Sequence, residues 1–254
     1  MSQSPEHAAM EVFWRLHEGL PQQGPGSDDS TRRALALVPE LPARPRILDL
    51  GCGPGRQSLV LARETGGEVT AVDLLPPFLA ELEARARFAG LSARIGTVQG
   101  SMAELPYEDE SFDLLWSEGA IYNIGFQDGL AGWRRLLRPG CAVAVTEVTW
   151  LMDTPPEPIR IFWDANYPAM QSLEDNHRAV AEAGYTLLGS FVLPDREWWD
   201  DYYAPLEERI EPLRCERDDP AWIAAFDAHE NELAIVRDCG GSFGYVFYVM
   251  QKPQ

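Results

Sequence analysis

The sequence predicts an α/β fold: an open, mostly parallel sheet with helices on both faces and a helical cap. Three observations lead to this prediction. A glycine-rich turn follows a buried strand at residues 47–55, strand-like and helix-like segments alternate from residue 46 to residue 150, and the rhythm changes after residue 150. Alternation of this kind is typical of parallel sheets, because consecutive parallel strands are joined by crossover helices. A chain of 254 residues is long enough for one such domain with an appendage.

The first half of the chain supplies five predicted strands and the helices between them. The predicted strands are 46–50, 68–74, 93–100, 112–119 and 141–150. The predicted helices are 57–64, 76–90 and 130–140. The helix at 76–90 has the clearest signals, since prolines begin it, apolar residues recur at i, i+4 spacing and a glycine ends it.

The second half predicts a strand hairpin interrupted by helical insertions. Residues 154–185 read as proline-broken helix, whereas 185–194 and the alternating, aromatic 242–251 read as strands. Two such strands suit an antiparallel hairpin at the edge of the sheet. We expect one domain over residues 1–254. Its predicted parts are an N-terminal helical cap or gate (1–40), a cofactor-binding core (45–150) and two insertions that cap the acceptor site (151–184 and 195–240).

Composition narrows the possible partners. The formal net charge is −19, so nucleic acid and anionic membrane surfaces are disfavoured as partners. No apolar stretch approaches the length of a membrane span, and the first residues lack the pattern of a signal peptide. The four cysteines have no metal-ligand spacing, so we predict no metal site and reduced thiols in a cytoplasmic protein.

The turn ILDLGCGPG at 47–55 carries the strongest functional signal. Glycines in such a turn let the backbone approach a ligand and direct amide groups toward it. The pattern is DxGxGxG, beginning at Asp49, and Arg56 stands where a dinucleotide fold wants its third glycine. Asp73 ends the second strand, where a carboxylate can accept hydrogen bonds from ribose hydroxyls in NAD and in adenosylmethionine alike.

These motifs resemble the class I S-adenosylmethionine-dependent methyltransferases, particularly the small-molecule branch that includes the ubiquinone and menaquinone C-methyltransferases. The resemblance covers residues 45–150. It rests on ILDLGCGPG, on VDL (72–74), on QGSMAELPYEDESFDLLWSEGAI (99–121) and on LLRPG (136–140), in the family's order. It departs mildly at Cys141, where the family usually has a second glycine. The resemblance implies a Rossmann-like sheet of seven strands in the order 3-2-1-4-5-7-6, with the last strand antiparallel.

The same resemblance implies S-adenosyl-L-methionine as the cofactor and assigns residues to its methionine end. Gly51 and Gly53 would line the methionine part. Asp49 would orient the turn or meet the methionine ammonium. The segment 22–30 is either a gate over the cofactor or a plain linker, and as a gate it makes Gln23 and Gly26 site candidates.

Other residues are assigned by the resemblance to the ribose and the adenine. Asp73 would bind the ribose hydroxyls, and Leu74 would pack on the adenine. Ser101 and Met102 would lie at the edge of the ring. Glu118, after the fourth strand, would lie at the switch region of the sheet and contribute to both cofactor binding and catalysis.

The acceptor site is predicted where the chain departs from the shared core. Glu118, Tyr122 and Asn123 follow the fourth strand and are the catalytic candidates, while Glu147 and Trp150 end the fifth strand and face the same crevice. Methyl transfer is an in-line displacement, and alignment alone lowers its barrier by roughly 7–11 kcal/mol, so a dedicated base is optional.

Aromatic residues of the second half are the candidates for contacting the acceptor. The substrate-binding candidates are Trp150, Trp163, Tyr167, Trp199 and Tyr203. Two interpretations stay open. These side chains either pack the cap onto the sheet, or form a pocket in which nearby carboxylates favour a planar or cationic acceptor through cation–π attraction. The carboxylates in question are Asp164, Asp200, Asp201 and Glu118.

We therefore predict methyl transfer from S-adenosylmethionine to a small-molecule acceptor. A nicotinamide-dependent oxidoreductase is the first alternative, disfavoured by the DxGxGxG pattern and by the lack of a Tyr-x-x-x-Lys pair. The second alternative is a non-catalytic relative that binds a metabolite. The acceptor, the atom that is methylated and the oligomeric state stay open at this point.

Overall fold

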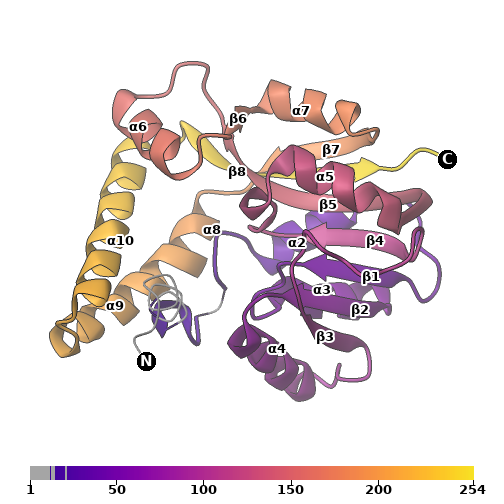
Figure 1. Cartoon of the computed structure of the whole chain (residues 1–254), viewed down its shortest axis with the longest axis horizontal. Coiled ribbons are helices and arrows are strands. Elements are labelled where there is room, and N and C mark those ends of the chain that lie inside the picture. Colours follow the sequence, from indigo (N-terminus) through magenta and orange to yellow (C-terminus); the bar gives the residue numbers. More distant parts are fainter. Residues whose placement is uncertain (1–11, 13–14, 21) are drawn as a thin grey trace.

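The computed structural model describes residues 12, 15–20 and 22–254, with Asp201 placed by its backbone only. Figure 1 shows a sheet with helices packed against it and a group of helices standing to one side. The first part of the chain comprises α2 (Asp28–Leu35), β1 (Arg46–Leu50), α3 (Arg56–Thr65), β2 (Glu68–Asp73), α4 (Pro76–Phe88), β3 (Ile95–Gln99), β4 (Phe112–Ser117), the 3-10 turns η1 (Ile121–Asn123) and η2 (Arg134–Leu136), α5 (Phe126–Trp133) and β5 (Leu137–Trp150).

The second part of the chain is mostly helical. It comprises α6 (Glu157–Asn166), β6 (Gln171–Ser172), α7 (Leu173–Glu182), β7 (Thr186–Val192), α8 (Arg196–Trp198), the π-helical turn η3 (Trp199–Tyr203), α9 (Ala204–Glu216), α10 (Pro220–Cys239) and β8 (Phe243–Gln251). Figure 1 shows α8, α9 and α10 away from the sheet, forming the cap, while β7 and β8 join the sheet itself.

The strands form one sheet in the order β3-β2-β1-β4-β5-β8-β7. Strands β1 to β5 run parallel, and β8 runs antiparallel to both of its neighbours, β5 and β7. The predicted α/β fold is therefore confirmed, including the antiparallel hairpin at the edge. One detail differs, because the two-residue strand β6 pairs with the end of β5 and adds an eighth strand.

Two hydrophobic cores lie on opposite faces of the sheet. On one face Leu61 of α3 and Leu82 of α4 pack with Trp116 of β4. On the other face Leu130 of α5 packs with Val143 of β5. Strands buried on both faces read as continuous apolar runs, and for this reason the segments at 46–50 and 112–117 were recognisable as central strands.

A third, smaller core joins the N-terminal segment to the cap. Leu16 and Leu20 pack with Leu206 of α9 and with Trp222 and Phe226 of α10. Residues separated by almost the whole chain therefore make one unit. This unit places the segment that precedes α2 at the edge of the crevice between the cap and the sheet.

The helix predicted at 130–140 differs from the observed elements. The helix α5 ends at Trp133, and β5 already begins at Leu137, which pairs with Phe112 of β4. The Pro139-Gly140 pair, which signals a turn, lies inside this strand. Gly140 has φ +78°, and the register between β4 and β5 shifts nearby, so an irregularity in the strand takes the place of the turn.

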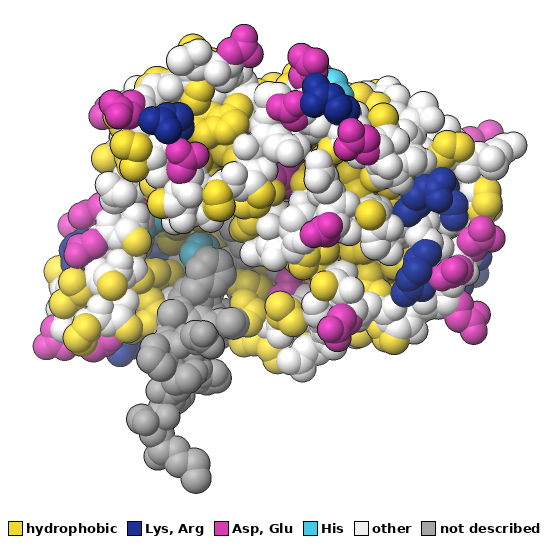
Figure 2. Space-filling view, turned by 45° about the horizontal axis from the view of Figure 1, so that its top comes forward, with side chains coloured by type: hydrophobic (Ala, Val, Ile, Leu, Met, Phe, Trp, Pro, Cys, Tyr) yellow, Lys and Arg dark blue, Asp and Glu magenta, His cyan; other side chains and the backbone are white. Residues whose placement is uncertain are grey.

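The surface agrees with the charge of the sequence. Figure 2 shows acidic side chains spread over the visible face, with basic side chains in a few separate groups. Within the described residues no helix combines the length and apolarity that crossing a bilayer requires.

Candidate active site

The glycine turn joins β1 to α3 at the carboxyl edge of the sheet. Gly51, Gly53 and Gly55 all have positive φ, between +52° and +77°. A Cβ atom on Gly51 would lie 2.4 Å from the Cβ of Ala120, so no side chain fits there without a shift. The amide of Gly51 also donates to the carbonyl of Val72 at 2.9 Å. The turn is thus fixed in a conformation that only glycine adopts readily.

Asp49 lies beneath this turn. It is fully buried, accepts hydrogen bonds from Ser58 and from the amide of Gln57, and does not line the cavity described below. Burial raises its pKa to about 7, although the two hydrogen bonds act in the opposite direction. Of the two roles expected for Asp49, the geometry favours orienting the turn.

Asp73 fastens the turn to the end of β2. Its Oδ2 accepts the amide of Gly53 at 2.8 Å, and its Oδ1 accepts the amide of Leu75 at 2.9 Å. Burial raises its pKa, and the backbone hydrogen bonds partly offset that shift. Each carboxylate oxygen has two lone pairs, so each keeps capacity for one further donor. Asp73 also lines the cavity, where those lone pairs are available to a ligand.

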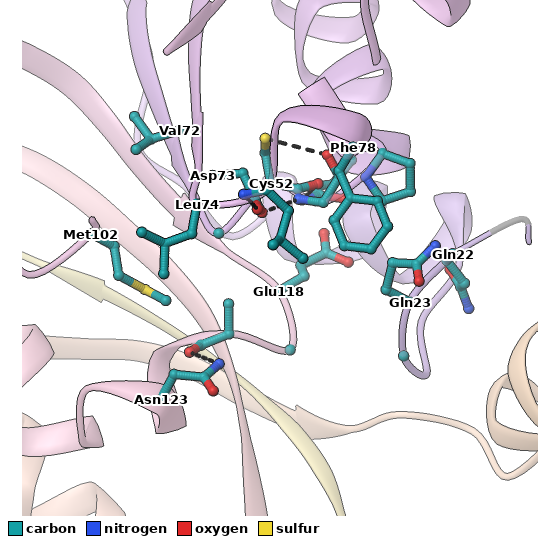
Figure 3. A pocket seen from close by; sticks show the side chains of 18 of the residues that line it. Gln22, Gln23, Cys52, Val72, Asp73, Leu74, Phe78, Met102, Glu118 and Asn123 are labelled. Carbon is teal, nitrogen blue, oxygen red and sulfur yellow. Dashed lines mark hydrogen bonds between the residues drawn. The ribbon is translucent and has the colours of Figure 1, made fainter. Parts of the chain in front are cut away.

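A cavity of about 770 Å³ lies above the turn. Its wall has an apolar part and a polar part. Figure 3 shows Val72, Leu74 and Met102 gathered at one end, whereas Gln22 and Gln23 lie at the other. Leu74 is 58% exposed, which is unusual for leucine and leaves its side chain free to pack on a ligand.

The lining includes only some of the predicted cofactor residues. Gly51, Gly53, Asp73, Leu74, Met102, Glu118 and Gln23 line the cavity. Ser101 does not; its hydroxyl accepts the amide of Ala103, and the neighbouring Gly100 takes the place in the wall. Gly26 also lies outside the lining, where its carbonyl accepts the side-chain amide of Gln22 at 2.5 Å.

The N-terminal segment closes one side of the cavity and is anchored to the cap. Ser27 caps α2 and donates to Glu197 of α8 at 2.6 Å. Gln23 donates to the carbonyl of His17 at 3.2 Å, but its Oε1 is buried and has no hydrogen-bond partner. A buried acceptor without a partner is costly. Gln23 is therefore a candidate to receive a donor from a bound ligand.

Glu118 connects this segment to the core. One of its oxygens accepts hydrogen bonds from Thr31 of α2 at 2.7 Å and from the indole of Trp116 at 2.8 Å. The other oxygen pairs with Arg56 at 2.5 Å. The side chain is only 6% exposed. A carboxylate engaged by three donors is suited to holding structure and poorly suited to removing a proton.

Tyr122 and Asn123 of η1 also line the cavity. Asn123 donates to the carbonyl of Ala120 at 2.9 Å, which fixes the turn that carries both residues. The Tyr122 ring makes an edge contact with the ring of Tyr167, with centroids 5.9 Å apart. Burial raises the pKa of Tyr122. Tyr122 thus forms the wall between the cavity and the interior of the cap.

The five predicted substrate residues all lie outside the cavity lining. The ring of Trp163 packs edge-on against that of Phe243, with centroids 5.2 Å apart. The ring centroid of Trp199 lies 5.4 Å from that of Tyr203. Tyr203 is fully buried. Trp150 is a partly buried member of the core beside the cap, and Tyr167 alone reaches a lining residue.

Two of the carboxylates expected near those rings, Asp164 and Asp200, do not line the cap interior in the structure. Asp164 and Asp200 are exposed, and Asp164 pairs with Arg160 on its own helix; the side chain of Asp201 lies outside the described part of the structure. Two other carboxylates lie among the rings. Glu147 of β5 is 1% exposed, and Glu232 of α10 accepts the hydroxyl of Tyr203 at 2.7 Å.

Of these two residues, only Glu147 was predictable from the sequence. Glu147 was recognisable, since a charged residue ends the buried strand at 141–150 and no apolar pattern explains it. Glu232 was missed, because α10 carries many acidic residues and nothing in its sequence distinguishes this one. Arg56 was noted only as a missing glycine, although it forms the ion pair with Glu118.

Comparison with known proteins identifies the domain. Residues 47–140 match the protein family described as "Methyltransferase domain". A malonyl-[acyl-carrier protein] O-methyltransferase of Enterobacter lignolyticus is 39% identical over 137 residues, which are 53% of this chain and 51% of that protein. The chain carries a class I S-adenosylmethionine-dependent methyltransferase domain. It spans about half the length of the curated relatives it matches.

Solved structures extend the likeness to the whole fold. A methyltransferase from Geobacter sulfurreducens in complex with S-adenosyl-L-homocysteine has a TM-score of 0.82 at 21% identity and covers 96% of this chain and 98% of its own. The 4+2 cyclase SpnF has a TM-score of 0.76 at 20% identity and covers 97% and 93%. Likenesses at these identities concern the fold. The predicted methyltransferase family is confirmed, whereas the ubiquinone and menaquinone branch within it stays a prediction.

Proposed function

We propose that this protein transfers the methyl group of S-adenosyl-L-methionine to a small-molecule acceptor. The observation that carries the proposal is the arrangement of Asp73 at the carboxyl edge of the sheet. Its carboxylate holds the amide of Gly53 and still faces a cavity of about 770 Å³. A carboxylate in that position is suited to ribose hydroxyls, and ligands of open α/β sheets bind at this edge.

The chemistry of the cavity fits the three parts of the cofactor. Leu74 and Met102 would pack on the adenine, and Asp73 would accept the ribose hydroxyls. The turn at Gly51 and Gly53 would lie against the methionine part. The buried, unpartnered Oε1 of Gln23 supports this assignment, because it offers an acceptor at the polar end of the cavity.

The bound cofactor would supply an electrophilic methyl group on a sulfonium. The protein then has to hold the acceptor in line and keep water out. Tyr122 and Asn123 form the wall nearest the cap, and the N-terminal segment closes the opposite side through Ser27 and Glu197. We assign Glu118 to positioning that closure, since its oxygens are taken by Arg56 and other donors.

A small acceptor is favoured by the net charge of −19, which disfavours nucleic acid as the acceptor. The cytoplasm is the proposed location, on the ground that all four cysteines are free. Nicotinamide chemistry is not favoured. Arg56 occupies the position of a third dinucleotide glycine, and its guanidinium is committed to Glu118.

The test is to supply the 254-residue protein with S-adenosylmethionine and panels of amine, hydroxyl and carbon-acid acceptors, and to measure the S-adenosylhomocysteine that is formed. Production that depends on one acceptor class supports the proposal. Tight binding of S-adenosylhomocysteine without turnover on any panel would indicate a metabolite-binding relative. Failure to bind S-adenosylhomocysteine at all would contradict the proposal.

A further inference from the structure

Five tyrosines meet where the cap joins the sheet. We call them the tyrosine cluster: Tyr122, Tyr167, Tyr202, Tyr203 and Tyr245. They come from η1, the end of α6, η3 and β8, segments that are far apart in the sequence. Figure 1 shows α6 and α10 coming together beside the start of β8, so the cluster lies at the junction of the cap and the sheet.

Two buried carboxyl groups flank this cluster. Glu147 lies beside the hydroxyl of Tyr167, and Glu232 accepts the hydroxyl of Tyr203 at 2.7 Å. Both carboxyl groups lie near enough to Tyr122 and Tyr245 for their charges to help raise the pKa of these two tyrosines. Two histidines also contact the cluster. His17 stacks on Tyr202, and the ring centroid of His229 lies 6.0 Å from that of Tyr203.

Glu147 is a buried acid that lacks a hydrogen-bond partner at one of its oxygens. It is 1% exposed, and its Oε2 has no hydrogen-bond partner. In the described part of the chain no arginine or lysine forms an ion pair with Glu147 or with Glu232. Burying a carboxylate without a counter-charge is expensive, and burial accordingly raises the pKa of Glu147 to about 8. A cation beside Glu147 would favour its ionised form. An unpartnered oxygen in the cluster that adjoins the cavity is a reason to look for its partner in a ligand.

The tyrosine cluster borders the cofactor cavity through Tyr122. Tyr122 lines the cofactor cavity on one side and contacts Tyr167 on the other. An acceptor that extends past Tyr122 would therefore meet tyrosine rings and the free oxygen of Glu147. Tyrosine faces attract cations, and the attraction increases where water is excluded.

We propose that the acceptor carries an ammonium group and that this group is bound by Glu147 and the tyrosine cluster. The inference rests on the proposed function, since it concerns the acceptor of that reaction. In this proposal Glu147 provides the negative charge that pairs with the ammonium group. The tyrosine rings select a cation over a neutral group of equal size.

The test uses two probes that differ in charge and hardly in shape: choline and 3,3-dimethylbutan-1-ol. Each is titrated by calorimetry at pH 9 into the 254-residue protein saturated with S-adenosylhomocysteine, because Glu147, with a pKa of about 8, is ionised at that pH. Choline is expected to bind at least about tenfold more tightly than the neutral alcohol. In Glu147→Gln this preference is expected to fall below about threefold, while the affinity for S-adenosylhomocysteine stays unchanged. Asp109→Asn, an exposed acid that pairs with Arg135, serves as the matched control and keeps the preference.

The outcomes separate the two proposals. Equal binding of the probes, or no binding of either to a protein that binds S-adenosylhomocysteine, overturns the ammonium assignment and leaves the proposed function intact. A preference for choline that survives Glu147→Gln overturns the role of Glu147. Failure of S-adenosylhomocysteine to bind removes the proposed function, and the inference falls with it. Circular dichroism of Glu147→Gln distinguishes a lost site from a lost fold, and Tyr167→Phe, which removes the hydroxyl beside Glu147 but keeps the ring, should retain most of the preference.

Discussion

The carboxyl groups on the two sides of the crevice differ in how many hydrogen-bond donors they have. On the cofactor side Asp49, Asp73 and Glu118 each have two or more donors from the chain itself. On the cap side Glu232 has one tyrosine hydroxyl, and Glu147 has an oxygen with no partner. The carboxyl groups of the cofactor side therefore have their hydrogen-bond donors before any ligand arrives. On the cap side no cation pairs with Glu147 or Glu232 among the described residues. A cationic ligand would supply the missing charge.

The cofactor side and the cap side also differ in how they are built. The cofactor side consists of parallel strands buried on both faces and of a turn whose glycines have no room for side chains. The cap side is built from helices, a π-helical turn and a segment near the N-terminus, which meet through apolar and aromatic contacts. A conserved type of ligand suits the first arrangement, and a variable one suits the second.

The largest expected effect comes from breaking the cofactor side at Gly51. Gly51→Ala places a Cβ atom 2.4 Å from Ala120 and should lower the free energy of unfolding by about 3 kcal/mol, from overpacking added to the strain of positive φ. Gly90→Ala is the matched control, because Gly90 has φ +71° with nothing within 4 Å of the added atom. It should cost only about 1 kcal/mol. Urea denaturation measures both, and equal losses would show that close packing at the turn is unimportant.

The next effect concerns the pH dependence of stability on the cap side. Burial raises the pKa of Glu147 to about 8 from 4.5, so the folded state binds a proton that the unfolded state has lost between these values. The folded state holds more protons, so stability falls as pH rises through this window. Linkage gives a loss of about 2 kcal/mol between pH 6 and pH 8 from this group alone.

Glu147→Gln should remove that loss, since the amide mimics the protonated acid and does not titrate. The quantity to measure is the difference between wild type and variant in urea denaturation at the two pH values. Asp49, whose pKa is about 7, adds a loss of the same sign in both proteins and cancels in this difference. Parallel pH profiles would mean that Glu147 is ionised and solvated in the folded protein.

A smaller effect is expected at Asp73. Asp73→Ala removes both acceptor oxygens and should weaken binding of S-adenosylhomocysteine about tenfold, through lost charge-assisted hydrogen bonds. Asp73→Asn keeps one oxygen and should lie between the wild type and the alanine variant. Asp109→Asn controls for the change in net charge. Unchanged affinity in Asp73→Ala would remove this residue from the cofactor site.

The smallest effect is expected at Glu118. Its oxygens accept hydrogen bonds from Thr31 and Trp116 and pair with Arg56, so Glu118→Gln should alter kcat by less than about threefold once an acceptor is known. A larger change is expected in the KM for S-adenosylmethionine, because Arg56 and Glu118 hold the segment beside the cavity. A drop in kcat of several hundredfold with unchanged KM would instead assign Glu118 to proton transfer.

Much of the cofactor side was predictable because its signals are local. The turn at 47–55 and the alternation of strands and helices determine the sheet, and Asp73 falls at a strand end whose direction the sheet dictates. The direction of Asp49 was not predictable, since a residue at a strand end can face the turn or the cavity. Ser101 and its neighbour Gly100 differ by one residue in a loop, and no period in the sequence tells which one meets the cavity.

The cap was predictable only as a region. Its aromatic residues were located in the right segments, but which rings face the crevice depends on the π-helical turn at Trp199–Tyr203 and on the contacts between α6 and α10. A π-helical turn shifts every following side chain around the helix axis, so the face cannot be read from a 3.6-residue period. Glu232 becomes notable only when Tyr203, 29 residues away, is brought against it.

The central claim is that the cofactor side of the crevice is a complete site for S-adenosylmethionine. Calorimetric titration of the wild-type protein with S-adenosylhomocysteine and, separately, with NAD⁺ tests it most directly. The expected result is one binding site per chain for S-adenosylhomocysteine, an affinity lowered about tenfold by Asp73→Ala, and no heat of binding for NAD⁺. Binding of NAD⁺ in place of S-adenosylhomocysteine, or of neither, would contradict the account.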